Sequence, residues 1–363
     1  MENFFNSVRI TNFKSLKDVT LSDCKRINLL IGKPNVGKSN ILEAIGLFGL
    51  PYFKYNKSKK ITQFVRLENI AELFFDGDME KGIVIKTDNG SCIVRYLESE
   101  GEIQFEIELK QFDVALPEMG IRELNELKDF LEGKESYLIA IDSRFNCSLK
   151  NKTKRHQQSR VKLYKFPQSS VAYTANYSGM FCNPLTPPNG ANLFDVIQHY
   201  KLENNLSGLF AEYGLKLLFD KTNKTLRIMK SLKEDNAMVS FPYSSIADTL
   251  QRIIFFKTAI ASNKNSILLF EEPEAHCFPP YIRQITQDIL DSETNQFFIA
   301  THSPYVLNDF LEYERNDVAI FIANFKNGET VIRRLTDEEV NDVYQYGIDL
   351  FFNHELFTDD QEH

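Results

Sequence analysis

The feature that most constrains this chain is a glycine-rich stretch near its start, Gly32 to Ser39 (GKPNVGKS). It matches G-x-x-x-x-G-K-[ST], the motif of a phosphate-binding loop, without a mismatch. The apolar run at 27–31 predicts a buried strand before the loop, and residues 40–45 predict a helix after it. A tight glycine turn between a strand and a helix N-terminus surrounds a phosphate with backbone N–H groups. The alternative is a glycine-containing turn that matches by chance, and the flanking strand and helix argue against it.

The residue types inside this loop predict how it would bind a nucleotide. The glycines let the backbone turn tightly enough for its N–H groups to ring a phosphate. In such loops the lysine reaches the β- and γ-phosphates, and the following hydroxyl holds Mg²⁺. We therefore expect a nucleoside triphosphate and Mg²⁺ as cofactors, with Lys38 on the phosphates and Ser39 on the metal. The expected nucleotide-binding residues of the loop are Gly32, Asn35, Gly37, Lys38, Ser39 and Asn40.

The composition is that of an ordinary globular protein. The chain has 363 residues, of which 43% are hydrophobic and 25% charged. No apolar run approaches the roughly 20 residues that span a bilayer, and no export signal is visible, so we expect no membrane partner. Five dispersed cysteines without CxxC spacing indicate reduced thiols and argue against a disulfide framework or a zinc site. We therefore expect a cytoplasmic protein.

Two further apolar runs end in residues that could act on a bound nucleotide. Residues 266–270 lead into Glu271 and Glu272, and residues 296–300 lead into His302. A phosphate-binding loop needs a second strand whose terminal carboxylate orients Mg²⁺, and Glu271 stands in that place. Glu272 is expected to orient the attacking water, and His302, at a strand's carboxyl end, to sense the γ-phosphate. The alternatives are solvated acids at a strand end and a structural histidine.

The rest of the chain shows several short periodic segments. Residues 8–21 alternate as a hairpin does, and a polar break at 187–192 precedes a helix at 193–200. Residues 121–131 carry apolar side chains at helical spacing, which predicts an amphipathic helix. Residues 82–86, 91–97 and 102–109 alternate as strands do and are expected to form a three-stranded antiparallel meander. The other expected strands are 215–219, 225–229, 317–323 and 330–335.

Three of these motifs together resemble those of the ABC-type ATPase heads of the SMC/RecF/OLD group. The resemblance is carried by Gly32 to Ser39, by LLFEEPEAH at 268–276 and by IATHSP at 299–304. It is strongest with the small stand-alone ATPases of that group found in prokaryotic phage-defence systems. It implies an α/β fold, a P-loop NTPase head of the ABC type with a mixed sheet flanked by helices, an antiparallel β subdomain and an inserted lobe.

The resemblance also suggests where the parts of the head lie. We expect its N-terminal part at 1–110, an inserted lobe with a basic segment at 111–188, and its C-terminal part at 189–363. The OLD nucleases carry a nuclease domain after the ATPase, and we recognise no nuclease in this chain.

The resemblance implies ATP as the nucleotide and hydrolysis in a head-to-head dimer. Glu271 corresponds to the Walker B acid, Glu272 to the catalytic glutamate and His302 to the switch histidine, so Lys38, Glu272 and His302 are the expected catalytic residues. Each nucleotide in such a dimer is capped by a signature helix of the other subunit.

The candidate signature segment is residues 242–254, in which Ser245, Asp248 and Arg252 are expected to contact nucleotide. Relatives read roughly Ser-Asp-Gly-Thr-x-Arg, whereas Ala247 and Thr249 here replace the serine and the glycine. This departure predicts a slow ATPase or use as a switch. The metal-sensing glutamine of the family is not evident, and Gln63 is the candidate.

A basic segment lies in the middle of an acidic chain. Residues 143–194 hold eight Lys or Arg and no Asp or Glu, whereas the whole chain has a net charge of −8. The candidates for contact with nucleic-acid phosphates are Lys150, Lys152, Lys154, Arg155, Arg160 and Lys162. A solvated flexible loop and a surface for an acidic protein partner are the alternatives.

Two hypotheses of different class follow from the sequence. The first is a dimeric or larger ATPase assembly that controls a separately encoded effector or acts on nucleic acid, in antiviral defence or DNA repair. The second is a nucleotide-dependent scaffold or sensor with little turnover. A transporter head and a phosphotransferase fit less well, because the acidic strand end and downstream histidine suit hydrolysis by water.

Overall fold

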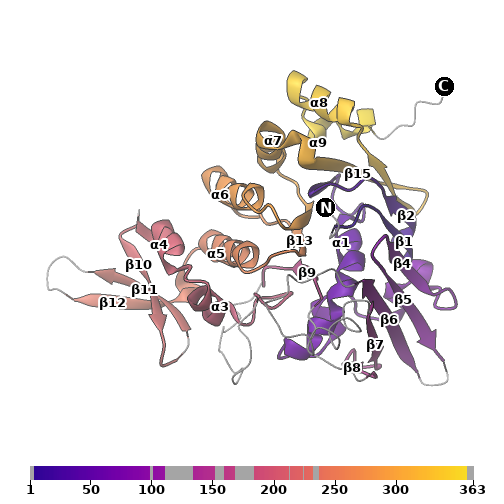
Figure 1. The fold of residues 1–363 in the computed structure, drawn as a ribbon, viewed down its shortest axis with the longest axis horizontal. Helices are drawn as coiled ribbons and strands as arrows, with labels where there is room; N and C mark the ends of the chain where they lie inside the picture. The colour runs from indigo at the N-terminus through magenta and orange to yellow at the C-terminus, as the bar shows by residue number, and fades with distance from the viewer. Residues whose placement is uncertain are drawn as a thin grey trace, which may run out of the picture.

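The computed structural model describes residues 4–98, 101–110, 134–151, 159–167, 184–211, 213–223, 225–231 and 237–357. A central, mostly parallel sheet organises them (Figure 1). Its strands, in spatial order, are β16 (Glu329–Arg334), β15 (Val318–Lys326), β3 (Ile27–Ile31), β14 (Gln296–Ala300), β13 (Ile267–Glu271) and β9 (Val161–Tyr164). Only β16 runs antiparallel to its neighbour. The predicted strand before the glycine-rich loop is β3, and its parallel neighbours bring their carboxyl ends to the same edge.

A second sheet is antiparallel and is built almost entirely from the first 150 residues. Its strands, in spatial order, are β2 (Leu16–Leu21), β1 (Val8–Phe13), β4 (Ile83–Thr87), β5 (Gly90–Leu97), β6 (Glu102–Lys110), β7 (Lys134–Ile141) and β8 (Cys147–Leu149). The predicted hairpin is β1–β2, and the predicted three-stranded meander is β4–β5–β6, so both are confirmed.

Two hydrophobic cores lie on the two faces of the central sheet. Leu30 of β3 faces one core, whereas its neighbours Leu29 and Ile31 face the other. The first core contains the apolar side of α1 (Lys38–Gly46) and the inner face of the antiparallel sheet. The second contains α5 (Asp248–Ala261), α6 (Pro279–Leu290) and α7 (Pro304–Tyr313), which lie side by side (Figure 1). The strands are therefore buried on both faces, as their continuous apolar runs predict.

Shorter elements connect these layers. The helices α8 (Asp337–Tyr346) and α9 (Leu350–Asn353) follow β16. The 3₁₀ segments are η1 (Leu47–Tyr55), η2 (Ile61–Gln63), η3 (Ile70–Leu73), η4 (Phe75–Gly77), η5 (Tyr243–Ser245), η6 (Arg315–Asp317) and η7 (His354–Phe357). Within the described ranges, no helix has the length and apolar character needed to cross a membrane.

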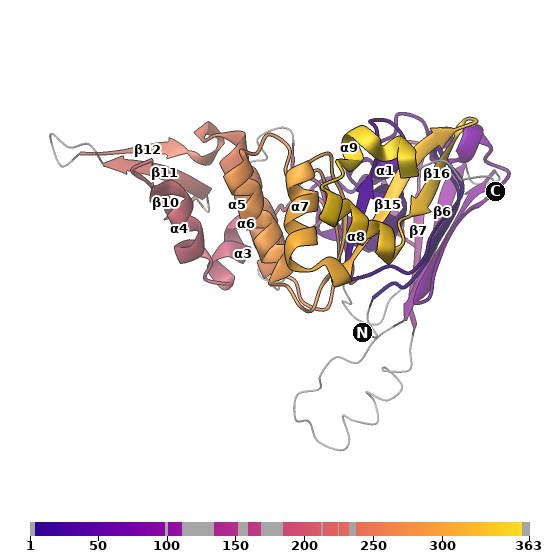
Figure 2. The same cartoon turned by 90° about the horizontal axis from the view of Figure 1, so that it is seen from above.

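A small lobe projects from the end of α5. It consists of α3 (Leu193–His199), α4 (Glu203–Ala211) and an antiparallel sheet of β10 (Leu215–Asp220), β11 (Thr225–Ser231) and β12 (Met238–Pro242). Both views place it at the opposite end of the molecule from the antiparallel sheet of β4–β7 (Figure 2). The predicted helix at 193–200 and the strands at 215–219 and 225–229 are confirmed.

The expected inserted lobe at 111–188 needs correction. The strands β7 and β8 extend the antiparallel sheet, and β9 pairs with β13 at the edge of the central sheet. Residue 110 is therefore no boundary of the fold, because the chain after it returns to the same two sheets. The helix predicted at 121–131 lies outside the described residues.

The basic segment also differs from its prediction. Lys162 is buried, and its Nζ donates to Ser266 Oγ at 2.9 Å, so it is not available to a nucleic acid. The Arg160 guanidinium lies over the Phe5 ring, and Lys150 pairs with Glu102 at 3.0 Å. Lys162 lies in β9 of the central sheet, whereas Lys150 follows β8 and pairs with β6 of the antiparallel sheet. The remaining candidates, Lys152, Lys154 and Arg155, lie outside the described residues.

Candidate nucleotide-binding site

The glycine-rich loop turns tightly between β3 and α1 because two of its glycines fit where no side chain would. Gly32 has φ +154°, and a Cβ there would lie 2.2 Å from the carbonyl oxygen of Ala323. Gly37 has φ +100°, and its Cβ would lie 2.2 Å from Thr330 Oγ1. Asn35 between them also has a positive φ, +62°. The cradle depends on glycine at both positions, as a loop that rings a phosphate requires.

Lys38 holds the loop together from inside. It is only 5% exposed, and its Nζ donates to the carbonyl oxygens of Gly32 at 2.8 Å and Lys33 at 2.7 Å. Burial lowers the pKa of the Lys38 ammonium to about 8, against the opposing effect of Glu272. The adjoining Asn40 Nδ2 donates to Ser15 Oγ at 2.8 Å, so it also ties α1 to the β1–β2 turn.

The carboxyl ends of β13 and β14 bring the two predicted acids and the histidine to the loop. Lys38, Ser39, Glu271, Glu272 and His302 all line one cavity of about 1170 Å³. The cavity is also lined by Asn35, Gly37 and Asn40. Residues from separate stretches of the sequence therefore meet at the edge that parallel-sheet topology predicts. Gly32 lies beneath the cavity, where its carbonyl oxygen holds Lys38.

Glu272 and His302 face each other across the ends of their strands. The His302 Nε2 lies 3.6 Å from Glu272 Oε1, and Glu272 adopts the left-handed φ of +44°. Burial lowers the pKa of His302 below its usual value, and the nearby Lys38 ammonium lowers it further, while Glu272 opposes both. A neutral imidazole beside a carboxylate can donate a hydrogen bond to, or accept one from, a group that approaches both side chains.

Glu271 is paired with two cations that the sequence did not single out. Arg66 Nη2 donates to Glu271 Oε1 at 2.6 Å, and Lys165 Nζ lies 3.9 Å from Glu271 Oε2. Arg66 follows η2 and Lys165 follows β9, and both line the cavity. Lys165 directly follows β9, a strand that the sequence did not predict. No signal marked Arg66.

A buried carboxylate on α1, that of Glu43, pairs with two lysines near the cavity. Glu43 has a side chain that is 1% exposed and pairs with Lys14 at 2.6 Å and Lys165 at 2.5 Å. Burial raises the pKa of Glu43, but the ammonium groups of Lys165 and Lys14 outweigh that effect, so the pKa lies below its usual value. Glu43 lies one helical turn beyond Ser39, which places this network directly beneath the loop.

Glu274 links the ends of β13 and β14 by a second buried network. Its Oε1 accepts from Thr301 Oγ1 at 2.7 Å and from the backbone N–H of His302 at 3.0 Å. Its Oε2 is buried and has no hydrogen-bond partner among the residues that the structure describes, and burial raises the pKa of this carboxyl. In the sequence Glu274 is only one residue of the motif LLFEEPEAH, whereas in the structure it binds the backbone N–H of His302.

The candidate signature segment forms η5 and the start of α5. Of its three predicted residues, Arg252 lines the cavity, whereas Ser245 and Asp248 do not. Arg252 Nε donates to Asp248 Oδ2 at 3.1 Å, and its guanidinium lies 4.7 Å from the Phe166 ring centre. Thr249 Oγ1 donates to the carbonyl oxygen of His276 at 2.6 Å. The polar groups of this helix start are thus engaged within their own chain.

The site has the donors that a nucleotide and Mg²⁺ would need. The glycine cradle and Lys38 suit phosphates, and Ser39 with Glu271 offers oxygen ligands for a metal. Among the described residues, no group of three or more His, Cys, Asp or Glu could hold a metal ion by itself. Gln63 also lines the cavity, and within the described part of the chain its buried Oε1 has no hydrogen-bond partner.

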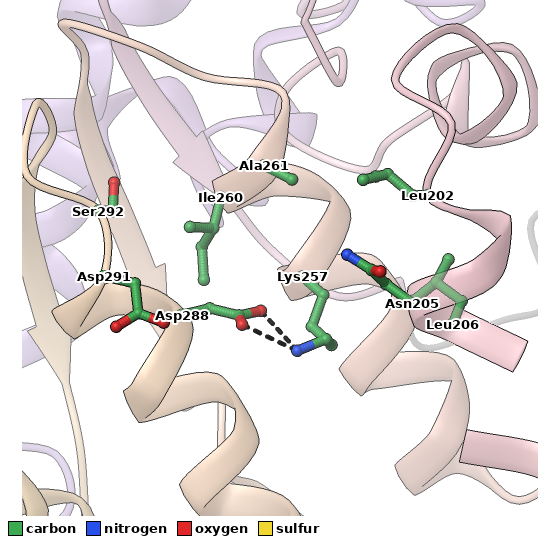
Figure 3. Close-up of a pocket in the computed structure, with 9 residues that line it drawn as sticks. All are labelled: Leu202, Asn205, Leu206, Lys257, Ile260, Ala261, Asp288, Asp291 and Ser292. Carbon is green, nitrogen blue, oxygen red and sulfur yellow. Dashed lines mark hydrogen bonds and ion pairs between the residues drawn. The ribbon is translucent and has the colours of Figure 1, made fainter. Parts of the chain in front are cut away.

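Two other pockets differ from this site. One, of about 330 Å³, adjoins it on the far side of Glu272 and His302 and is lined by Pro304 and Tyr305 of α7. The other, of about 250 Å³, lies between α4, α5 and α6 (Figure 3). Its polar feature is an ion pair of 2.7 Å between Lys257 and Asp288, beside which Leu202 and Leu206 line the wall. It contains no residue of the nucleotide motifs.

Comparison with known proteins agrees with this geometry. The family model described as "AAA domain, putative AbiEii toxin, Type IV TA system" matches residues 27–308, a range that begins with β3 and ends within α7. The chain belongs to this AAA domain family. The matched range contains the glycine-rich loop and the ends of β13 and β14, so membership and site geometry rest on the same residues.

Individual relatives of this AAA domain protein are distant. It is 22% identical to an ATP/GTP phosphatase of Helicobacter pylori over an alignment of 327 residues that covers 82% of this chain and 85% of that protein. It is 33% identical to the DNA replication and repair protein RecF of Clostridioides difficile over 76 residues, 21% of this chain and 19% of RecF.

Solved structures show the same fold as this AAA domain protein. An SMC head bound to the C-terminal winged-helix domain of ScpA superposes with a TM-score of 0.51, at 15% identity, covering 93% of this chain and 99% of that one. An SMC head from Pyrococcus furiosus, bound to the C-terminal domain of ScpA, gives 0.51 at 12% identity, covering 94% and 99%. The protein is thus an AAA domain protein with the SMC-head fold, as the resemblance predicted.

Proposed function

We propose that this protein binds and hydrolyses Mg²⁺-ATP. The observation that carries the proposal is the meeting of Lys38, Ser39, Glu271, Glu272 and His302 in one cavity. In this scheme Lys38 and the loop's N–H groups bind the phosphates, and Ser39 and Glu271 hold Mg²⁺. Glu272 orients the attacking water, and His302 responds to the γ-phosphate. The naming of a relative as an ATP/GTP phosphatase supports hydrolysis and leaves adenine and guanine as alternatives.

We propose further that the active form is a homodimer or a larger assembly held together by nucleotide. The cavity opens beside the pocket formed by Pro304 and Tyr305, and Tyr305 is 56% exposed, as is suitable for contact with a second head. The assembly would control a separately encoded effector or act on nucleic acid, in antiviral defence or DNA repair, within the cytoplasm. The match to RecF supports the nucleic-acid branch over 21% of the chain only.

A scaffold with little turnover is the second candidate, and one specific observation favours it. The first turn of α5 would have to cap a nucleotide of the other subunit, but Thr249 and Asp248 are bonded to His276 and Arg252 of their own chain. Those hydrogen bonds would have to be broken before Asp248 and Thr249 could contact a nucleotide, so the first turn of α5 would bind the nucleotide more weakly. ATP would then hold the assembly together without rapid turnover.

One experiment separates the candidates. ATP turnover is measured against protein concentration for the wild type and Glu272→Gln, together with the size of the protein with and without ATP. Turnover that rises faster than linearly, and that the substitution abolishes while ATP-bound dimers accumulate, supports the dimeric ATPase. ATP-dependent dimers without turnover in either form support the scaffold. No ATP binding at all overturns both.

A further inference from the structure

Arg66 belongs to no recognised motif, yet it neutralises the carboxylate that the proposed function assigns to Mg²⁺. Its Nη2 lies 2.6 Å from Glu271 Oε1, the distance of a short charge-assisted hydrogen bond. The Arg66 side chain is 67% exposed, whereas that of Glu271 is 10% exposed. Glu271 is thus a fixed, nearly buried anion, and Arg66 is the accessible member of the pair.

The backbone of Arg66 is held at both of its polar groups. Its N–H donates to Glu43 Oε1 at 3.2 Å, and its carbonyl oxygen accepts from Lys14 Nζ at 2.6 Å. Glu43 is itself buried and paired with Lys165, so the group that accepts the Arg66 N–H is part of the packed interior. The backbone position is fixed, and only the long side chain can change its partner.

Glu271 Oε1 accepts a hydrogen bond from the Arg66 guanidinium at 2.6 Å. If the same oxygen also bound Mg²⁺ at its preferred distance of about 2.1 Å, the guanidinium and the metal ion would be forced close together. The repulsion between them is strong in a partly enclosed cavity, where water screens charges poorly. The other oxygen of Glu271 faces Lys165, whose Nζ lies 3.9 Å away. Both oxygens of Glu271 therefore have a cation nearby, and the exposed Arg66 is the one that can leave.

We propose that Arg66 and a divalent cation compete for Glu271. The guanidinium is the counter-ion of Glu271 when no metal is bound, and Mg²⁺ displaces it into the cavity that the phosphates would occupy. In the metal-free state Arg66 takes the place of the metal, because it neutralises the carboxylate charge that would otherwise repel a nucleotide. This inference rests on the proposed function for the identity of the metal and the nucleotide, but its core is the competition itself.

The first test uses the metal alone. Mn²⁺ binding to the full chain without nucleotide is measured by electron paramagnetic resonance for the wild type, Arg66→Gln and Arg66→Lys. Loss of the competing charge is expected to tighten Mn²⁺ binding about fivefold in Arg66→Gln, whereas Arg66→Lys keeps the charge and stays within about twofold of the wild type. Unchanged Mn²⁺ affinity in Arg66→Gln overturns the proposal.

The control is a matched ion pair outside the cavity. Arg9 Nη2 pairs with Asp18 at the same 2.6 Å on the β1–β2 hairpin, and the Arg9 side chain is 60% exposed. Arg9→Gln removes the same charge from the chain and is expected to leave Mn²⁺ affinity unchanged. An equal gain in Arg9→Gln would show a general effect of net charge and would overturn the competition.

The second test measures ATP affinity with Mg²⁺ and with EDTA. Without metal, Arg66 neutralises Glu271 in the wild type, so Arg66→Gln is expected to lose about fivefold more ATP affinity in EDTA than in Mg²⁺. An equal change in both conditions overturns the exchange. If the wild type binds no ATP, the proposed function is refuted. In that case the Mn²⁺ titration still decides whether Arg66 competes with a divalent cation for Glu271.

Discussion

His302 Nε2 lies 3.6 Å from Glu272 Oε1, although Glu272 follows β13 and His302 follows β14, with the helix α6 between these strands in the sequence. The pair is held from behind by Glu274, which accepts from the backbone N–H of His302. A water or a phosphate oxygen that contacts both groups would meet an acceptor at the carboxylate and a neutral ring at the imidazole. The proposed hydrolysis needs such an arrangement at the γ-phosphate.

We expect His302→Ala to lower ATP turnover by about 100-fold while ATP affinity changes by less than about threefold, because the imidazole acts on the reacting phosphate. Turnover and ATP binding are measured separately at about pH 7.5, where the imidazole is neutral. The control is His199→Ala on α3, an exposed histidine of the small lobe, which should leave turnover unchanged. Equal losses in both variants would remove His302 from the mechanism.

The lowered pKa of Lys38 predicts how ATP affinity depends on pH. With a pKa of about 8, the Lys38 ammonium predominates below that value and is lost as the pH rises through it. ATP affinity should therefore fall between about pH 7 and about pH 9.5, by at most about tenfold per pH unit. Lys38→Met should bind ATP weakly and without this dependence. A wild-type affinity that stays constant across this range would contradict the prediction.

We expect Gly37→Ala to abolish ATP binding, since the new Cβ would lie 2.2 Å from Thr330 Oγ1 and 2.9 Å from Ser15 Oγ. Gly328→Ala in the β15–β16 turn is the matched control. Its φ of +86° gives similar backbone strain, of about 1–2 kcal/mol, but no atom lies within 4 Å of the new Cβ. Calorimetric ATP titration and thermal unfolding of both variants separate the clash from the strain. ATP binding by Gly37→Ala at wild-type affinity would refute the cradle.

Substitution of Glu43 should destabilise the fold. Glu43→Gln leaves Lys14 and Lys165 without their buried carboxylate, at a cost of about 3–5 kcal/mol at neutral pH. Because the folded pKa of Glu43 is lowered, its stabilising effect is present above the ordinary glutamate pKa and is lost as the pH falls through the folded value. Urea unfolding of both proteins at neutral and at low pH measures the difference, which should shrink with acidification. The exposed Glu312→Gln on α7 is the control and should change stability by less than about 0.5 kcal/mol.

Glu274 should tolerate a neutral isostere. Its raised pKa and partnerless Oε2 indicate that burial disfavours the charged form, so Gln can keep the two hydrogen bonds that Oε1 accepts. Glu274→Gln is expected to retain turnover within about threefold, whereas Glu274→Leu leaves the His302 N–H without its acceptor and loses at least about tenfold. If Leu and Gln behave alike in turnover and thermal stability, Glu274 does not position His302.

The parts of the fold that could be predicted are those with a strong local signal. The apolar runs of β3, β13 and β14 are buried on both faces, so their composition alone marks them as interior parallel strands. The hairpin and the meander were evident from alternation, and the loop from its glycines. By contrast, β9 has four residues and contains Lys162, which no propensity rule places inside a sheet. Its membership of the central sheet depends on pairing with β13, a strand far along the chain.

The candidate site divides in the same way. Sequence by itself determined the phosphate-binding loop, the acids at the end of β13 and His302, because each follows directly from a local motif. Only the tertiary structure decided that Arg66 and Lys165 approach Glu271, that Glu43 holds Lys165, and that Lys162 is interior. Those relationships join residues that are far apart in the sequence, and the position of a charged residue in the sequence does not indicate which residue it will pair with. The local sequence motif determines the chemical role that each residue can take, and the packing of the two sheets around α1 determines which residues lie close enough to act together.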